Sequence, residues 1–273
     1  MTPHRTVFGI VGALALACIG SVACGDGTPP FVGTAHAATL SRATSALPTI
    51  VLVHGAFADG TGWQRLIPIL EHDGYSVIAV QNPLSSLSAD IATTKRVIDA
   101  QQGKVVVVGH SYGGAVITGA AFGNANVMAL VYLAAFAPDA NEPVAAFNDH
   151  YPSALGPALR PDAAGFLYID RSSFHEVFAA DVNKSDAEVM AVTQKPINNT
   201  AFAASVPAPA WRTIPSWYLV STEDRAINPD LERFYAKRMG ASTTEIRASH
   251  VAFISHPEEV ARFIERAAGS LRQ

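Results

Sequence analysis

The stretch KVVVVGHSYGG, residues 104–114, decides the fold of this chain. Its valine run is apolar at every position, which is typical of a strand covered on both faces in a parallel sheet. Residues 109–113 then match the pattern Gly-x-Ser-x-Gly, and the small residues from Ser111 to Phe122 predict a helix. A sharp strand-to-helix turn strains its central serine and leaves no room for flanking side chains, which explains the glycines. The stretch therefore predicts that Ser111 is a nucleophile at a helix N-terminus, where partial positive charge favours a developing anion.

Further runs of apolar and β-branched residues predict the remaining strands. These runs are Thr49–Val53, Tyr75–Val80, Val127–Leu133, Ser216–Val220 and Thr243–Arg247. Helical stretches lie between them, at residues 62–72, 90–100, 229–239 and 257–268, and the last two open with proline, which favours the first turn of a helix. Strands that alternate with helices indicate the α/β class, with a mostly parallel, doubly wound sheet.

Residues 138–214 interrupt this alternation. The segment is rich in proline, has short helical stretches at 174–180 and 185–192, and lies between two predicted strands. We interpret it as a helical cap inserted above the carboxyl edge of the sheet. The predicted core is then formed by residues 48–137 and 215–273.

The N-terminal residues 1–37 have the order of a secretory signal peptide. Arg5 supplies the positive charge, residues 7–23 are almost entirely apolar and small, and Ala35-His36-Ala37 forms an A-x-A cleavage site. Cleavage after Ala37 would leave residues 38–47 as a linker and place the protein outside the cytoplasm, secreted or periplasmic. The alternative is a lipoprotein that is anchored through Cys24.

Composition excludes several classes of protein. The chain of 273 residues is 49% hydrophobic and 15% charged, whereas a disordered chain has few apolar residues and high charge. The formal net charge of −4 offers no basic excess to neutralise phosphates, so no nucleic-acid partner is predicted. Both cysteines, Cys18 and Cys24, precede the predicted cleavage site, so thiol chemistry is excluded from the mature chain. No membrane contact is predicted unless a lipid is attached at Cys24.

A serine nucleophile requires a base, and the chain has nine histidines. His250 directly follows the last predicted strand, at the same carboxyl edge as Ser111, and we predict that it is the base. The base in turn requires a carboxylate that orients it. Asp224 follows the preceding strand and is the predicted carboxylate, with its neighbour Glu223 as the alternative.

The first predicted strand ends in the sequence HGAF, residues 54–57. Gly55 permits a turn that directs the backbone N–H of Ala56 at a substrate oxygen, and the N–H of Tyr112 completes the predicted oxyanion hole. His54 is interpreted as a structural hydrogen-bonding residue. Aromatic side chains near these positions could line an apolar acyl pocket together with Tyr112: Phe57, Phe136 and Phe202.

Taken together, these motifs resemble the α/β hydrolases of the compact esterase and hydroxynitrile-lyase type. The resemblance is carried by the oxyanion segment, the serine turn and the chain order of three side chains: residues 54–57, residues 109–114, and Ser111, Asp224 and His250. It implies the α/β-hydrolase fold. A serine at position 111 argues against epoxide hydrolase and haloalkane dehalogenase activity, because those relatives use an aspartate there.

The expected function is that of a secreted serine carboxylesterase for small to medium carboxylic esters. Ser111 would attack the ester carbonyl, His250 would pass the proton to the leaving alcohol, Asp224 would orient the imidazole, and water would cleave the acyl-enzyme. No metal or organic cofactor is implied, and the expected partner is the small-molecule ester. Two alternatives stay open: a lyase that uses the same triad on a cyanohydrin or a C–C bond, and a ligand-binding protein with slow turnover.

Overall fold

A computed structural model describes residues 47–270, so the predicted signal peptide, Cys24 and nearly all of the predicted linker lie outside the described residues. Six strands form one sheet in the order β2-β1-β3-β4-β8-β9, in which every neighbouring pair is parallel. Each predicted strand is present, and the predicted fold class is confirmed. The strands are β1 (Thr49–Val53), β2 (Val77–Val80), β3 (Val105–His110), β4 (Val127–Leu133), β8 (Ser216–Ser221) and β9 (Ser242–Ile246).

Strand β3 lies in the interior of the sheet, between β1 and β4. The register pairs Val53 with Gly109 and His110 with Leu133, so the three strands end side by side. Residues Val105 to Val108 are fully buried, because helices cover both faces of the sheet. This burial explains why the run contains no polar residue.

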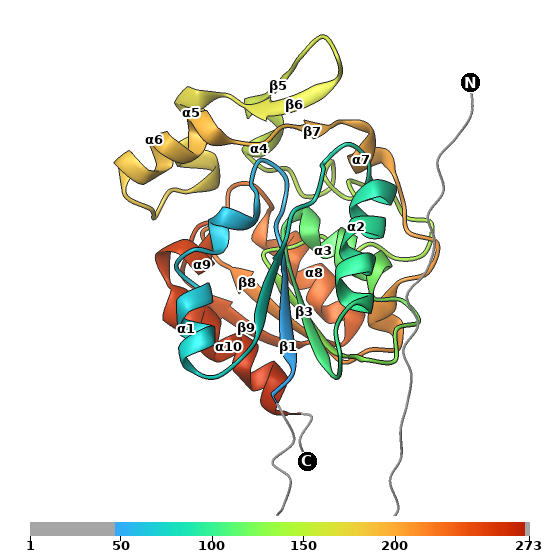
Figure 1. Ribbon diagram of the computed structural model, residues 1–273. Coiled ribbons are helices and arrows are strands. Elements are labelled where there is room, and N and C mark those ends of the chain that lie inside the picture. The colour runs from blue at the N-terminus through green and yellow to red at the C-terminus, as the bar shows by residue number, and fades with distance from the viewer. Residues whose placement is uncertain (1–46, 271–273) are drawn as a thin grey trace, which may run out of the picture. The chain divides into compact units, whose positions relative to one another are not determined.

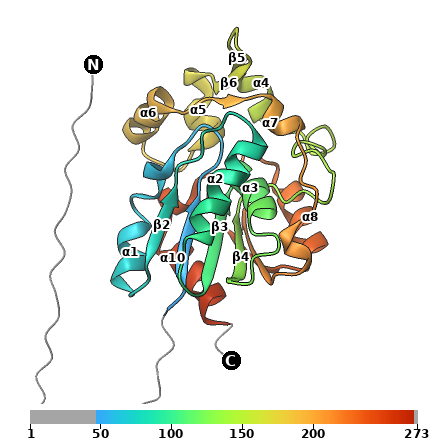
Figure 2. The same ribbon diagram turned by 45° about the vertical axis from the view of Figure 1, so that its right-hand side comes forward.

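The helices form a layer on each face of the sheet (Figures 1 and 2). Helices α2 (Leu87–Asp99), α3 (Tyr112–Ala120) and α8 (Pro229–Met239) cover one face, and α1 (Ile67–His72) and α10 (Pro257–Gly269) cover the other. A short helix α9 (Ala252–Ser255) precedes α10. This arrangement is the doubly wound order expected from the sequence.

Two helices differ in extent from the sequence prediction. The stretch expected as one helix over residues 62–72 is divided into a 3-10 turn, η1 (Gly60–Trp63), and α1, which begins with Pro68 in its first turn. Proline lacks an N–H and fits the first turn of a helix better than its interior. Helix α2 begins earlier than the predicted Asp90, because the Ser86 hydroxyl accepts a hydrogen bond from the Ala89 N–H at 3.2 Å and caps it.

The predicted cap segment lies between β4 and β8 and covers the carboxyl ends of the strands (Figure 1). The sequence analysis predicted a helical cap, but the segment also contains strands. Three short antiparallel strands form a separate small sheet within it. Strands of two to four residues are too short for an alternating pattern to be recognised in the sequence. Its elements are α4 (Leu155–Ala158), β5 (Leu159–Pro161), β6 (Phe166–Ile169), α5 (Arg171–Phe178), α6 (Lys184–Thr193), β7 (Ile197–Asn198), α7 (Thr200–Ala203) and η2 (Ala210–Arg212).

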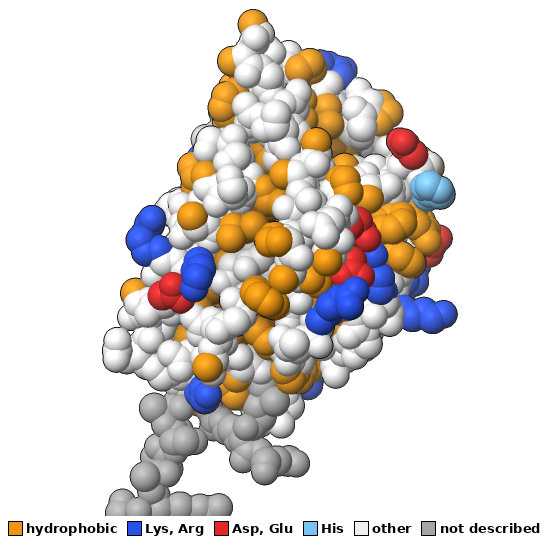
Figure 3. Space-filling view, turned by 90° about the vertical axis from the view of Figure 1, so that its right-hand side faces the viewer, with side chains coloured by type: hydrophobic (Ala, Val, Ile, Leu, Met, Phe, Trp, Pro, Cys, Tyr) orange, Lys and Arg blue, Asp and Glu red, His pale blue; other side chains and the backbone are white. Residues whose placement is uncertain are grey.

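Few charges occupy the surface, in line with the composition. Figure 3 shows one face, on which hydrophobic side chains are interspersed with neutral polar surface and charged groups are sparse. Within residues 47–270, no helix has the length and apolar character that a membrane span requires.

Candidate active site

Ser111 lies at the turn between β3 and α3. Its backbone has φ 54° and ψ −125°, a left-handed conformation that costs a non-glycine residue about 1–3 kcal/mol. Hydrogen bonds hold the turn in place: the Ser111 N–H donates to Leu133 O at 3.2 Å, and the Ser111 carbonyl accepts from Gly114 N (3.0 Å) and Phe136 N (3.1 Å). The end of β4 therefore enforces the strained conformation.

The glycines of the turn are required by close packing of the backbone. A Cβ atom at Gly113 would lie 2.4 Å from Val53 O, and one at Gly109 would lie 2.7 Å from Gly113 O. Real Cβ atoms essentially never approach backbone atoms so closely. The pattern of residues 109–113 thus allows α3 to start directly against β1.

His250 and Asp224 are joined by a buried hydrogen bond, in which Nδ1 of the imidazole lies 2.5 Å from Oδ2 of the carboxylate. The other carboxylate oxygen, Oδ1, accepts from the backbone N–H groups of Ala226 (2.6 Å) and Ile227 (2.9 Å). Because a carboxylate can only accept, the His250 proton lies on Nδ1, and Nε2 keeps the lone pair that a base needs. Glu223, the alternative orienting acid, is directed elsewhere and pairs with Arg247 at 2.6 Å on the surface.

His110, the residue before Ser111 in the chain, contacts His250. The His110 Nε2–H donates to the backbone carbonyl of His250 at 2.9 Å, and the two rings are 4.5 Å apart between centroids. Burial, followed by the neighbouring His250, holds the pKa of His110 well below its ordinary value, so its ring is neutral. The structure thus brings the three predicted catalytic side chains to one sheet edge, each in the loop after a strand.

The predicted oxyanion segment lies against the nucleophile. A Cβ atom at Gly55 would lie only 2.7 Å from Cβ of Ser111, so the backbone that carries Ala56 passes directly beside the serine. Phe57, the next residue, has φ 61°, a second strained position in this region. The N–H of Tyr112 belongs to the first turn of α3, where helical N–H groups have no partner within the helix.

Tyr112 is held in place by a buried acid that the sequence prediction did not include. Its hydroxyl donates to Asp90 Oδ2 at 2.7 Å, and Asp90 Oδ1 accepts from the Leu84 N–H at 2.8 Å. Burial raises the pKa of Asp90, and the two hydrogen bonds oppose that effect. The carboxyl thereby connects α2 to the residue after the nucleophile.

His54 has the structural role expected for it. Its Nδ1 lies 2.8 Å from Gly55 O, and its Nε2 accepts the Asn82 N–H at 3.0 Å. Both ring nitrogens are therefore used by the backbone of the protein itself. Burial lowers the pKa of His54 to about 4, which keeps the ring neutral at ordinary pH.

The aromatic residues predicted to line a pocket form two separate clusters. Phe202, from the cap, packs against Tyr112 at 5.8 Å and Phe136 at 6.3 Å between ring centroids. Phe57 instead contacts Phe178, at 6.3 Å between ring centroids. The predicted lining residues therefore divide between two groups of ring contacts.

Two residues of the cap reach the site and were missed by sequence reasoning. The ring of Phe178, at the end of α5, packs on His250 at 4.9 Å. The carboxylate of Asp181 accepts hydrogen bonds from the Ser249 N–H (3.0 Å), the Ser249 hydroxyl and the Ser255 hydroxyl (2.8 Å). No local pattern distinguishes these residues from an ordinary buried phenylalanine and a surface aspartate.

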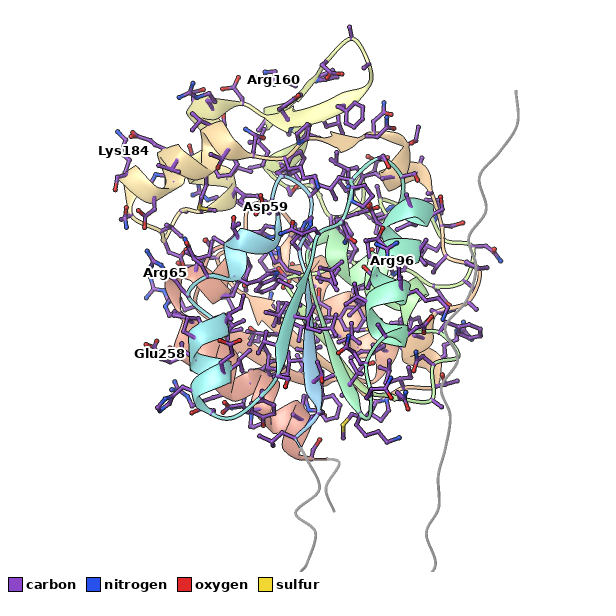
Figure 4. The ribbon with its side chains drawn as sticks, in the orientation of Figure 1. Asp59, Arg65, Arg96, Arg160, Lys184 and Glu258 are labelled. Carbon is purple, nitrogen blue, oxygen red and sulfur yellow. The ribbon has the colours of Figure 1, made fainter. Side chains whose placement is uncertain are left out.

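A cavity of about 470 Å³ lies beside the oxyanion segment, between residues 57–65 and α6. Its lining includes Phe57 and Met190, and the ion pair of Arg65 with Asp186 (2.6 Å) joins the core to the cap there. Figure 4 shows Asp59 and Arg65 beside η1, below the helix that carries Lys184. Ser111 is not among the residues that line this cavity, and it is only 6% exposed. A second cavity, of about 490 Å³, lies within the cap and touches none of the predicted site residues.

Comparison with known proteins places this geometry in a family. The model of the alpha/beta hydrolase family matches residues 50–263. The alpha/beta hydrolase nvfD of Aspergillus novofumigatus is 25% identical over 245 residues, which cover 81% of this chain and 97% of that protein. Polyneuridine aldehyde esterase of Rauvolfia serpentina is 24% identical over 252 residues, with coverage of 78% and 92%.

A solved structure shows the same fold. The pyrethroid hydrolase from Sphingobium faniae JZ-2 superposes with a TM-score of 0.70 at 22% identity, over 82% of this chain and 98% of that chain. The match of the family model to most of the chain, and the strained serine at the predicted turn, lead to one conclusion. This chain belongs to the alpha/beta hydrolase family.

Proposed function

We propose that this protein is a serine carboxylesterase in which Ser111 is the nucleophile, His250 the base and Asp224 the residue that orients the base. Ester hydrolysis as the class of reaction is supported by the family and by relatives that include a named esterase. The observation that carries the assignment is the buried 2.5 Å hydrogen bond between His250 Nδ1 and Asp224 Oδ2, beside the strained turn of Ser111.

The first half of the reaction forms an acyl-enzyme. The Ser111 hydroxyl attacks the ester carbonyl carbon while Nε2 of His250 takes its proton, and the carbonyl oxygen becomes an oxyanion. Asp224 stabilises the imidazolium that forms and stays ionised itself. The imidazolium then returns the proton to the leaving alkoxide as the ester C–O bond breaks.

The second half repeats the same steps with water. His250 removes a proton from water, which attacks the acyl carbon, and Ser111 leaves as the proton returns to its oxygen. In both halves the N–H groups of Ala56 and Tyr112 donate to the oxyanion, and each such donor is worth about 3 kcal/mol of barrier. These steps use the three side chains, the two backbone N–H groups and water.

The enclosure of Ser111 supports small to medium esters as the substrates. Ser111 is 6% exposed, and aromatic rings pack on its neighbours: Phe178 on His250 and Phe202 on Tyr112. Apolar walls favour an apolar acyl group, and each buried CH₂ contributes roughly 0.8 kcal/mol until the space is full.

The test is hydrolysis of p-nitrophenyl esters by wild-type protein and by Ser111→Ala. Wild-type protein should turn over and should bind one organophosphate per chain, whereas Ser111→Ala should lose on the order of 10⁶ in kcat and stay unlabelled. Equal labelling of both proteins would place the nucleophile elsewhere. A burst without turnover would indicate a ligand-binding protein, and cleavage of a cyanohydrin in place of esters would indicate a lyase.

Export of the protein is proposed from the sequence of residues 1–37, with a lipid at Cys24 as the alternative. Mass determination of protein recovered from the medium or periplasm tests it. A mature chain that begins at Ala38 supports cleavage after Ala37, a lipid-modified Cys24 supports the alternative, and an intact N-terminus contradicts both.

A further inference from the structure

A second carboxyl group, that of Glu232, is buried next to the carboxylate that orients His250. Glu232 lies in the first turns of α8 and has no exposed surface. Its Oε2 accepts the backbone N–H of Ser221, the last residue of β8, at 3.0 Å. Its Oε1 has no hydrogen-bond donor among the described residues and is buried. The side chain that faces it is Asp224.

The two carboxyl groups differ in how many donors stabilise a negative charge. Asp224 accepts from Ala226, Ile227 and His250, whereas Glu232 accepts from Ser221 alone. Two carboxylates that are buried side by side repel each other, so one of the two carboxyl groups holds a proton. The group with fewer donors is the one that stays protonated.

Arg233 opposes the rise in the pKa of Glu232, but its effect is smaller than those of burial and of Asp224. The neighbouring Arg233 is directed to the surface, where it pairs with Glu245 and Asp230. Tyr218, on β8, is buried, and its hydroxyl donates to Ala135 O, so it supplies no proton to Glu232. Burial, followed by the charge of Asp224, raises the pKa of Glu232 well above its ordinary value, which agrees with the neutral form.

A proton on Oε1 also explains why that oxygen has no donor. A protonated carboxyl is itself a donor, and it needs an acceptor rather than a partner N–H. The acceptor within reach is the Asp224 carboxylate, with which the Glu232 side chain makes a hydrogen bond. An atom that is unsatisfied as an acceptor is thus satisfied as a donor.

We propose that Glu232 is a neutral positioning residue, which donates a hydrogen bond to Asp224 and so holds that carboxylate in line with Nδ1 of His250. This role rests on the proposed function, since it matters only if His250 is the base. Glu232 does not touch the substrate. It acts by fixing the orientation of Asp224 and by keeping a single negative charge behind the imidazole.

The test compares Glu232→Gln and Glu232→Met with a matched control, Glu265→Gln. Glutamine keeps the shape and can donate to Asp224 through its amide NH₂, whereas methionine fills the space without a donor. Glu265, on α10, forms a second carboxyl pair, with Asp73 after α1. Its replacement controls for the loss of any such pair.

Two quantities are measured for each variant. One is kcat and KM for p-nitrophenyl acetate between pH 5 and 9. The other is the downfield proton resonance of the His250 Nδ1–H in the Ser111→Ala background. The methionine variant should lose on the order of tenfold in kcat with an unchanged KM, the size of one hydrogen bond to a charged group. Its resonance should shift, and glutamine should restore most of the kcat and the resonance.

Three results would overturn the proposal. A methionine variant with wild-type kcat and resonance, even if it unfolds more easily, would leave Glu232 with a packing role alone. A glutamine variant as impaired as methionine would show that the charged carboxylate is what matters. An equal loss in Glu265→Gln would show that the effect is not local. If the wild-type protein cleaves no ester, the proposed function fails, but the resonance still tests the link between Glu232 and His250.

Discussion

At the scale of single residues, Asp224 and Glu223 are adjacent acids with opposite surroundings. Asp224 is buried against His250, and Glu223 is paired with Arg247 in solvent. We expect Asp224→Asn to lower kcat by about 10⁴, because the asparagine amide favours the wrong imidazole tautomer. Glu223→Gln, the matched change one residue away, should alter kcat less than twofold, because exposed ion pairs contribute little. Steady-state kinetics of both variants at one pH tests this expectation. A larger loss of kcat in Glu223→Gln than in Asp224→Asn would refute Asp224 as the orienting carboxylate.

His54 gives the folded protein a sensitivity to acid. Its pKa is about 4 in the folded protein and about 6.5 in the unfolded chain, so the unfolded chain takes up the proton first as pH falls. The folded state consequently loses up to about 3 kcal/mol between pH 6.5 and 4. Protonation would also remove the acceptor that Nε2 offers to the Asn82 N–H.

Urea unfolding at a series of pH values tests this expectation. His54→Gln should flatten the decline of the free energy of unfolding between pH 6.5 and 4, whereas His72→Gln, at an exposed position on α1, should leave the decline unchanged. Parallel declines in wild-type protein and His54→Gln would remove His54 as the cause.

At the scale of elements, the loop after β9 is joined to the cap through Asp181. This aspartate accepts three hydrogen bonds from Ser249 and Ser255, on either side of the predicted base His250. We expect Asp181→Ala to reduce kcat by on the order of tenfold while the fold is kept, because one cap residue orders the loop that carries His250. The measurement is kcat together with the far-ultraviolet circular dichroism spectrum.

Asp186→Ala is the control for that change. Asp186 also joins the cap to the core, but its ion pair with Arg65 is 44% exposed on both sides, and it reaches the segment after His250 only through Arg65, which donates to Ile254 O at 3.2 Å. It should leave kcat within twofold. If both substitutions reduce kcat equally, cap attachment in general is responsible, and Asp181 has no special part in it.

The elements show which parts of this fold a sequence can predict. The central strands β1, β3 and β4 are buried runs of mostly apolar residues, so their pattern is local and strong, and the loops that carry Ser111, Asp224 and His250 follow from the strand order. Phe178, Asp181 and Glu232 contribute through contacts between distant segments, and no spacing marks them. Glu232 in particular stands in a charged stretch, DLER, that is typical of an exposed first helical turn. The small sheet of the cap was missed because its strands are too short to show a period.

At the scale of the whole molecule, we propose that the cap determines which esters reach Ser111. The cap and core together leave the nucleophile 6% exposed. We expect kcat/KM to rise with acyl length over the first few carbons and to fall for long chains, which would clash with the enclosing rings. Measurement over acyl groups of about two to sixteen carbons tests this expectation. A steady rise to the longest chain, with activation at an oil–water interface, would instead show a lipase with a mobile lid.

The aromatic enclosure of Ser111 also bears on the choice of nucleophile in the second half-reaction. Ser111 is only 6% exposed, and the ring of its chain neighbour His110 packs on Phe178, so an acyl group attached there has little contact with bulk water. Small alcohols partition into such surroundings more readily than water does, because the transfer of their apolar groups out of water is favourable. Alcohol dissolved in the medium would then compete for the acyl group out of proportion to its concentration. The same fold that hydrolyses an ester in water would, in mixed solvent, exchange one ester for another.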